Sequence, residues 1–222
     1  MKSDSTNDKA AREYSRCVIV GAAPIKNPAF ALSGLKEGDY FIYCDGGLSH
    51  EDILKRPPDL IVGDFDSHPA PEDPLCEMIR LPCEKDDTDT VFAVKEGIRR
   101  GFKEFLLLGA VGARLDHTLA NISVLLMLDR LGLHGVIIDD YSELEIVSGQ
   151  AEIPDSFGYF SVLSLFGDAE GVTETGSKYT VRNGRISCDY QYGVSNEVLP
   201  GSTAKVLVTS GSLLLIKVFR QH

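Results

Sequence analysis

Short apolar segments alternate with amphipathic helix patterns from Cys17 to about Asp140, and this alternation constrains the fold more than any other feature. The apolar segments are rich in Ile, Val, Leu and Tyr, which is typical of strands covered on both faces. Strand–helix–strand alternation predicts right-handed crossovers and a mostly parallel sheet. We therefore expect an α/β domain with three layers (α/β/α), whose strands lie at residues 17–21, 40–44, 60–63, 78–81, 104–108 and 136–139.

Two helices are predicted with defined ends. The first begins at Thr88 or Asp89, which can cap free backbone N–H groups, and stops at Gly101, a suitable residue just past a helix. The second runs from about His117 to Leu131. Because that segment is apolar nearly all round, we expect the second helix to be deeply buried.

The pattern changes after about residue 143, where strand signals follow one another without a helix of useful length. Asn183-Gly184 is a strong two-residue hairpin signal, and Ser210-Gly211 is a weaker one. These features predict an all-β sandwich or barrel with strands at 159–166, 178–182, 185–188, 204–209 and 213–218. We place the α/β domain at residues 16–145 and the β-rich domain at residues 146–222.

Charge and cysteine content narrow the class of protein. The formal net charge is -11, which argues against a nucleic-acid or anionic-membrane partner, because both require a basic surface. The five cysteines are odd in number and form no C-x-x-C pair, as in a reduced chain without structural zinc. No apolar stretch is long enough to span a bilayer. We expect a soluble, cytoplasmic protein.

Acidic motifs follow four of the predicted strands. In an open α/β sheet, ligands bind in the crevice at the carboxyl ends of the strands, so motifs far apart in sequence converge there. Several carboxylates with one Lys and one Arg suit a magnesium-bound polyphosphate. The four motifs are Asp45-Gly46-Gly47, Gly63-Asp64-Phe65-Asp66-Ser67, Lys85-Asp86-Asp87-Thr88-Asp89 and Gly112-Ala113-Arg114-Leu115-Asp116-His117.

Asp64 and Asp66 form the most specific pair. Two residues apart in an extended chain, their side chains point the same way and can reach one divalent ion. Gly63 permits close backbone approach. A polar turn after a strand would also use these residues. The three other acidic strand ends favour the functional interpretation.

The segment that opens the first helix has two compatible interpretations. Asp86, Thr88 and Asp89 suit ordinary capping of a helix N-terminus, which does not exclude metal ligation. Lys85 can meet phosphate oxygens as a point charge, with a solvated surface lysine as an equal alternative. Asp87 is expected to face solvent.

Arg114, Asp116 and His117 open the second helix, and Asn121 follows one turn later. A loop before a helix N-terminus is suited to anions, and Arg adds a planar fork for phosphate. The alternative pairs Arg114 with Asp116. We favour function for both and a structural role for His117. Asn121 fits the crevice and a loop cap equally well.

Two further motifs carry weaker signals, and several common nucleotide-binding and hydrolase motifs are absent from the sequence. Asp45-Gly46-Gly47 suits either a ligand pressed against backbone or a tight turn, and we favour the ligand. Ser195-Asn196 lies in a polar, turn-like cluster that is more typical of structure. The sequence contains no Walker P-loop, no full G-x-G-x-x-G fingerprint and no G-x-S-x-G elbow.

The ordered set of motifs resembles the thiamin pyrophosphokinase (thiamin diphosphokinase) family over most of the chain. That family runs D-G-G, G-D-F-D-S, K-D-x-T-D and G-G-R-x-D-H with a following Asn, then a β-rich domain with an S-N pair. Ala113 replaces the second Gly of G-G-R, and the first loop, Gly21-Ala22-Ala23-Pro24, fits only loosely. The resemblance implies transfer of a diphosphoryl group from ATP to thiamin, and a homodimer with active sites between subunits.

These observations together assign roles to the candidate residues. We expect Asp64, Asp66 and Asp89 to hold Mg²⁺ and, with Asp116, to form the catalytic set. ATP is assigned Asp45, Gly46, Lys85, Thr88, Arg114 and Asn121. Thiamin is assigned Asp86, Ser195 and Asn196, the last two by resemblance alone. The alternatives are a pyrophosphokinase or phosphohydrolase acting on another small substrate, and a non-catalytic thiamin- or nucleotide-binding regulator.

Overall fold

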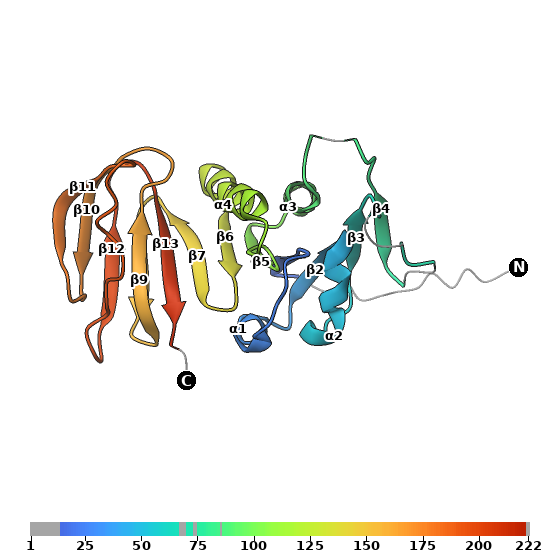
Figure 1. Ribbon diagram of the computed structural model, residues 1–222, viewed down its shortest axis with the longest axis horizontal. Coiled ribbons are helices and arrows are strands. Elements are labelled where there is room, and N and C mark those ends of the chain that lie inside the picture. Colours follow the sequence, from blue (N-terminus) through green and yellow to red (C-terminus); the bar gives the residue numbers. More distant parts are fainter. Residues whose placement is uncertain (1–13, 67–69, 73–74, 85, 221–222) are drawn as a thin grey trace, which may run out of the picture.

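The computed structural model describes residues 14–66, 70–72, 75–84 and 86–220 (Figure 1). Predicted strands 60–63 and 104–108 are confirmed residue for residue, and the other four of the first half agree within two residues at each end. The elements of this half are β1 (Arg16–Val20), α1 (Pro28–Ser33), β2 (Asp39–Cys44), the 3-10 helix η1 (Asp45–His50), α2 (Glu51–Leu54), β3 (Leu60–Gly63), β4 (Glu77–Arg80), α3 (Asp89–Arg99), β5 (Glu104–Leu108), α4 (Leu115–Arg130) and β6 (His134–Ile138).

These strands belong to a nine-stranded sheet ordered β4-β3-β2-β1-β5-β6-β7-β13-β9. The first six strands are parallel to their neighbours, and the last three pair antiparallel. The chain proceeds outward from β1 through β2 in one direction and from β5 through β6 in the other. The strand order therefore reverses between β1 and β5, and an open sheet of this kind binds ligands at such a point.

Helices cover both faces of the parallel part of the sheet. Alternate residues of a strand point to opposite faces. In β2, Ile42 joins the core beneath α3 and α4, while Phe41 joins the core beneath α1 and α2. Figure 1 shows the two helix pairs on opposite sides of the sheet. The expected three-layer arrangement is confirmed.

The helix α4 differs in part from its prediction. Its burial begins near Asn121 and Ile122, whereas Leu115 and Leu119 are 66% and 52% exposed. The first turns are not covered by the sheet, so only the later turns pack into the core. In the described part of the chain, no helix is long and apolar enough to cross a membrane.

The five cysteines all lie within the described residues, and none forms a disulfide. Cys17 and Cys44 are buried in β1 and β2, as the sequence predicted. Burial raises the pKa of the Cys17 thiol, mainly through loss of solvation. This thiol therefore behaves as a small apolar side chain.

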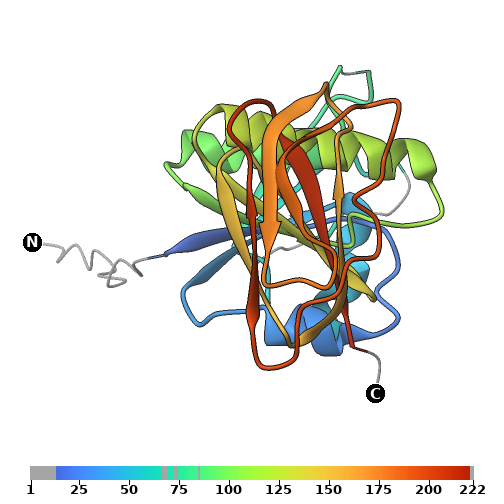
Figure 2. The same ribbon diagram turned by 90° about the vertical axis from the view of Figure 1, so that its left-hand side faces the viewer.

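The second half of the chain forms an antiparallel β sandwich. Strands β7, β13 and β9 extend the long sheet, and a second sheet ordered β11-β10-β12-β8 packs against them. Figure 2 views the molecule from this end. The elements are β7 (Ser142–Val147), β8 (Gln150–Pro154), β9 (Phe157–Leu163), β10 (Ala169–Thr175), β11 (Val181–Ile186), β12 (Thr203–Leu207) and β13 (Leu213–Phe219).

The predicted hairpin at Asn183-Gly184 is wrong, because both residues lie inside the single strand β11. Asn183 has a φ of 47°, and the pairing of β10 with β11 shifts register beside it. Its backbone N–H donates to Thr173 Oγ1 at 3.1 Å. The positive φ that this dipeptide tolerates is used in a β-bulge, which needs the same backbone conformation as a tight turn.

The weaker signal at Ser210-Gly211 also does not form a hairpin. It connects β12 of the second sheet to β13 of the long sheet, and these strands do not pair. Gly211 has a φ of 81°, and a side chain there would clash with the Asp168 carbonyl oxygen. The glycine serves the corner at which the chain changes sheets.

A buried ion cluster separates two hydrophobic cores on one face of the long sheet. Along β13, Leu215 belongs to the sandwich core, and Phe219 packs against the α1 side. Lys217 lies between them and is 7% exposed. Its ammonium group pairs with Glu143 and, at 2.8 Å, with Glu145 Oε1. The buried ammonium charge of Lys217 is therefore paired with carboxylates, as burial requires. The boundary between residues 145 and 146 falls within β7 and stays a prediction.

Candidate active site

A cavity of about 550 Å³ lies at the carboxyl ends of the parallel strands. Its walls come from the loops after β1, β2, β3 and β5 and from the first turns of α3 and α4. This is the place where an open α/β sheet binds its ligand. Eight of the predicted site residues line this cavity: Asp45, Gly46, Asp64, Asp66, Thr88, Asp89, Arg114 and Asn121.

Asp45, Asp64 and Asp66 form an acidic cluster in this cavity. One carboxylate oxygen from each lies within 4.8 Å of the others, and Asp45 is buried. Opposite ligands of an octahedral Mg²⁺ stand about 4.2 Å apart, since each bond measures about 2.1 Å. The spacing and the all-oxygen donor set therefore fit a hard divalent cation. Asp89 lines the same cavity, but it does not belong to this closest group.

Glycines allow the strand ends to come together. A Cβ atom on Gly47 would lie 2.1 Å from the Val20 carbonyl oxygen, so η1 can pack against the end of β1 only with glycine there. A Cβ atom on Gly63 would lie 2.9 Å from the Asp45 Cβ. The absence of that atom brings the end of β3, and Asp64 after it, against Asp45. These glycines thus assemble the acidic cluster.

The chain turns between Asp64 and Asp66, so the expected extended geometry is wrong. Phe65 has a φ of 58°, in the left-handed region, and the Arg80 guanidinium lies over its ring, 5.5 Å from the centroid. The Asp66 N–H donates to Asp64 Oδ1 at 3.4 Å. A non-glycine residue in this conformation is uncommon and typical of sites where geometry matters. The turn, rather than an extended chain, brings both carboxylates to one cluster.

The N-terminus of α3 faces the same cavity. Thr88 caps the helix, because its Oγ1 accepts a hydrogen bond from the Val91 N–H at 3.3 Å, and Asp89 occupies the first turn. Asp87, expected to face solvent, instead pairs with Lys95 at 2.6 Å. Asp86 is exposed and does not line the cavity. Lys85 lies outside the described residues.

Arg114 lines the cavity and pairs with Asp116, whose carboxylate it meets at 2.6 and 3.2 Å. Their side chains are 70% and 65% exposed. The hydrogen bond from Arg114 lowers the pKa of Asp116 to about 2. Asp116 itself is not part of the cavity wall. The pairing that sequence reasoning offered as the structural alternative is therefore present.

The loop after β5 is held by two side chains of α4. Asn121 is buried and donates through Nδ2 to the Ala110 carbonyl oxygen at 2.7 Å, while it also lines the cavity. Thr118 Oγ1 accepts a hydrogen bond from the Gly112 N–H at 3.2 Å. Asn121 thus both faces the crevice and supports its loop, and Thr118 is a contributor that sequence reasoning missed.

His50 is a second residue that sequence reasoning missed. It is 6% exposed, and its Nε2 lies 3.0 Å from the carbonyl oxygen of Ala23, a residue of the cavity wall. Burial lowers the pKa of the imidazole. A neutral ring with the proton on Nε2 can donate this bond, so His50 holds the loop after β1. A lone His after a Gly-rich turn carries no sequence signal for that role.

Ser195 and Asn196 lie in the sandwich, and neither lines the cavity of its own chain. The Asn196 amide is 4% exposed and fully hydrogen-bonded. Its Nδ2 donates to Glu174 Oε2 at 2.6 Å and to the Tyr179 carbonyl oxygen at 2.7 Å. Its Oδ1 accepts from the N–H groups of Tyr179 and Glu197 at 3.1 and 2.9 Å. Ser195 is exposed, with a φ of 59°.

Comparison with known families agrees with this architecture. Residues 33–136 match the thiamin pyrophosphokinase catalytic domain, and residues 150–213 match the thiamin pyrophosphokinase vitamin B1 binding domain. The first match covers most of the parallel sheet, and the second lies within the sandwich. The interval between the two matches contains the predicted domain boundary.

Curated relatives and solved structures give the same result. The chain is 26% identical to thiamine pyrophosphokinase from Bacillus subtilis over 163 residues, which cover 70% of this chain and 76% of the relative. It is 23% identical to thiamin pyrophosphokinase 1 from Caenorhabditis elegans over 221 residues, 92% of this chain and 88% of the relative. The structure of thiamin pyrophosphokinase from Geobacillus thermodenitrificans has a TM-score of 0.79 at 26% identity, covering 93% and 98% of the two chains. The Bacillus subtilis structure has a TM-score of 0.81 at 23% identity, covering 93% and 100%. The chain is therefore an enzyme of the thiamin pyrophosphokinase family, a group of transferases.

Proposed function

We propose that the chain transfers the diphosphoryl group of Mg-ATP to the hydroxyl of thiamin, giving thiamin diphosphate and AMP. The observation that carries this proposal is the acidic cluster of Asp45, Asp64 and Asp66 within a cavity that also holds a helix N-terminus and Arg114. We also infer a cytoplasmic homodimer. Cysteines without disulfides fit a reducing compartment.

The acidic cluster supports magnesium as the metal. Asp45, Asp64 and Asp66 would hold the ion, and Asp89 faces the same space as a further ligand. When bound, Mg²⁺ offsets the repulsion between these carboxylates and the phosphate oxygens of ATP and polarises the transferred group. Three acidic side chains alone would repel a triphosphate. The cluster therefore requires a cation for the proposed reaction.

The remaining negative charge on the transferred group would be stabilised by Arg114, Lys85 and the N-terminus of α3. A helix N-terminus carries a partial positive charge and favours anions. The Arg114 side chain is exposed and bonded to a carboxylate, so it can exchange Asp116 for a phosphate oxygen at little cost. In-line attack by the thiamin hydroxyl on the β-phosphorus then releases AMP. Positioning and electrostatic stabilisation account for most of the rate in such transfers.

Two carboxylates, Asp86 and Asp116, are candidates for orienting the thiamin hydroxyl or accepting its proton. While Arg114 is bound, Asp116 has a pKa of about 2 and accepts a proton poorly. Once Arg114 has moved to a phosphate oxygen, Asp116 is released from this pair, so both carboxylates are candidates in the complex with ATP. Asp86 is exposed near the start of α3 and is therefore accessible to a substrate entering from outside.

The thiamin subsite is proposed on the sandwich of a second copy of the chain. None of the residues 150–213 lines the cavity of its own chain. Ser195 is exposed and can contact thiamin, whereas the saturated Asn196 amide holds the segment that presents Ser195. A cavity with residues for nucleotide and metal, but none from the vitamin-binding part, supports completion by a partner subunit.

The acidic cluster is tested by a product assay. Purified protein is incubated with Mg-ATP, with and without thiamin, and AMP, ADP and thiamin diphosphate are separated by chromatography. We expect thiamin-dependent AMP from the wild type and from Asp52→Asn, an exposed change on α2. Asp64→Asn should lose turnover by at least about a hundredfold, since a charge-stabilising group is removed. Near-normal turnover of Asp64→Asn across a magnesium titration would refute the metal assignment. Binding of thiamin without turnover would favour a regulator, and ADP or free phosphate would favour another phosphotransferase.

The shared site is tested by complementation. Asp64→Asn should inactivate the portion of the active site that the α/β domain contributes. Ser195→Trp should block the portion that the sandwich contributes. A homodimer with sites between subunits has one fully wild-type site in each mixed dimer. Random mixing should therefore restore about a quarter of the wild-type activity. No recovery in a sample shown to contain mixed dimers would contradict the shared site.

A further inference from the structure

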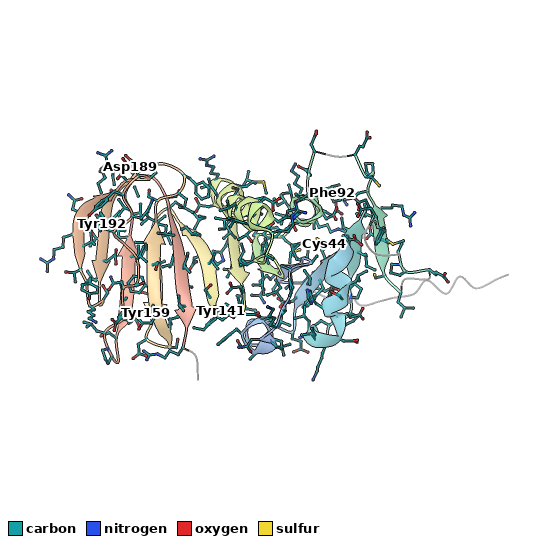
Figure 3. The ribbon with its side chains drawn as sticks, in the orientation of Figure 1. Cys44, Phe92, Tyr141, Tyr159, Asp189 and Tyr192 are labelled. Atoms are coloured by element: carbon teal, nitrogen blue, oxygen red, sulfur yellow. The ribbon has the colours of Figure 1, made fainter. Side chains whose placement is uncertain are left out.

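His50 is buried behind the wall of the acidic cavity and does not itself line it. It ends η1, the 3-10 helix that begins with Asp45 of the acidic cluster. In Figure 3, the labelled Cys44 marks the end of β2, directly before this helix. The two ends of one short helix therefore serve the cavity in different ways, because Asp45 supplies a carboxylate and His50 reaches the loop after β1.

The contact that His50 makes lies where three loops of the cavity wall meet. Its Nε2 is 3.0 Å from the carbonyl oxygen of Ala23, in the loop after β1. The Ala23 N–H donates to the carbonyl oxygen of Gly109 at 2.9 Å, in the loop after β5. A Cβ atom on Gly112 of that same loop would lie 2.8 Å from the Ala23 Cβ. Ala23, Gly109 and Gly112 all line the cavity, so the Ala23 peptide joins the loops after β1, β2 and β5.

Small residues leave the loop after β1 with little side-chain packing of its own. It begins Gly21-Ala22-Ala23, and a Cβ atom on Gly21 would lie 2.6 Å from the Gly109 carbonyl oxygen. Backbone therefore rests directly on backbone here, and the loop offers few apolar atoms to the core. Hydrogen bonds must then set its position. The bond from His50 ties this loop to η1, the segment that carries Asp45.

Burial fixes the protonation state of this imidazole. A carbonyl oxygen only accepts hydrogen bonds, so the ring proton must lie on Nε2. The Nδ1 atom is buried and has no hydrogen-bond partner among the described residues. Loss of solvation lowers the pKa of His50, and the bond to Ala23 opposes this change in part. At neutral pH the ring is therefore uncharged and donates to Ala23.

The loops that meet at Ala23 bring no ionisable side chain to the ring. Residues 21–24 and 109–112 are Gly, Ala, Pro and Val. The acidic residues nearest to His50 in sequence belong to its own helical segments, η1 and α2: Asp45, Glu51 and Asp52. Glu51 and Asp52 are exposed, so water screens them. A proton added to Nδ1 would thus place a charged donor in a buried space without an acceptor among the described residues, which is unfavourable.

We propose that His50 is a positioning residue for the transfer reaction and that, as a neutral imidazole, it holds the loop after β1 in the wall of the acidic cavity. The proposal rests on the function proposed above for the identity of the ligand, Mg-ATP. When the ring gains a proton, it leaves Ala23 and the loop loses its anchor on η1. The affinity of the cavity for its ligand then falls.

The test compares a variant that keeps the donor with one that lacks it. His50→Gln retains an N–H donor at its Nε2, whereas His50→Leu is similar in size and has none. The matched control is His134→Gln, which removes an imidazole whose side chain is 57% exposed. Mg-ATP binding to the full-length protein is measured by titration calorimetry, and thermal unfolding reports the folded fraction. We expect His50→Leu to bind about fivefold more weakly, as for one lost hydrogen bond, and both Gln variants to bind within about twofold of the wild type.

Kinetics and pH separate positioning from a merely structural role. A smaller folded fraction lowers the apparent kcat, whereas a displaced loop raises KM for Mg-ATP. The wild-type KM should rise as pH falls from about 8 to about 5, and His50→Gln should show a smaller rise, because its amide does not titrate.

Unchanged Mg-ATP binding by folded His50→Leu, or equal pH dependence of KM in wild type and His50→Gln, overturns the proposal. Should His50→Leu not fold, the pH comparison supports or overturns it by the same criterion, with Mg-ATP binding in place of KM where there is no turnover. If the wild type forms no thiamin diphosphate but His50→Leu binds Mg-ATP more weakly than His50→Gln, the proposed function fails and the positioning role of His50 stands.

Discussion

Replacing Asn196 by Ala should destabilise the sandwich by about 3 kcal/mol. The substitution removes the four hydrogen bonds of a buried amide. The Glu174 carboxyl is 1% exposed and loses its donor, which costs about 2 kcal/mol for a buried polar group. Tyr179 is exposed, so its backbone groups can bond to water, and their loss adds about 1 kcal/mol. For a chain of this length, that change lowers Tm by about 6–12 °C.

Thermal and urea unfolding of Asn196→Ala and of the exposed neighbour Ser195→Ala test this magnitude. We expect Ser195→Ala to unfold within about 0.5 kcal/mol of the wild type. A double mutant that also replaces Glu174 by Leu should recover part of the loss, since removing both partners leaves no unpaired carboxyl. A loss below about 1 kcal/mol for Asn196→Ala would refute the role of the amide as a buried clamp.

Three further predictions follow from the structure. Burial raises the pKa of Glu174, so the native state binds more protons than the unfolded chain and the free energy of unfolding falls as pH rises above about 4.5. Glu174→Gln should remove this contribution to the pH dependence of the unfolding free energy, measured by urea titrations at several pH values. An unchanged pH dependence would contradict the buried, proton-binding carboxyl. Gly47→Ala places a Cβ atom 2.1 Å from the Val20 carbonyl oxygen and should lower the free energy of unfolding in urea by about 3 kcal/mol. An unchanged free energy of unfolding would argue against the close approach of η1 and β1. Asp116→Asn releases Arg114 for phosphate and should lower KM for ATP by up to about fivefold. A large fall in kcat at constant KM would instead identify Asp116 as the proton acceptor.

The parallel sheet could be predicted from the sequence because its strands carry continuous apolar runs that end in glycine or an acidic turn. Leu60–Gly63 and Glu104–Leu108 are of this kind. The sandwich strands are half-exposed, and β7 alternates apolar and acidic residues. Alternation does not reveal which sheet a strand joins. The Asn183-Gly184 dipeptide shows a further limit, since a bulge and a hairpin need the same backbone conformation.

The candidate site was predictable where chemistry and topology agree. Acidic residues that follow neighbouring parallel strands must lie close together, and eight predicted residues line one cavity. The sequence could not predict that Asp45, rather than Asp89, joins Asp64 and Asp66 in the acidic cluster. That arrangement depends on the close packing of Asp45 against Gly63, which has no side chain. The supporting role of His50 depends on one hydrogen bond to Ala23 in the loop after β1, and that of Thr118 on its bonds to Gly112 in the preceding loop. Residue spacing carries no information about such bonds.

The most direct test of the proposed reaction is a ³¹P NMR time course of the purified protein with Mg-ATP and thiamin. Diphosphoryl transfer predicts that AMP and thiamin diphosphate appear together in equal amounts, with no ADP or inorganic phosphate, and that both signals are absent without thiamin. Accumulation of ADP, or of AMP without thiamin diphosphate, would contradict the proposed transfer of an intact diphosphoryl group.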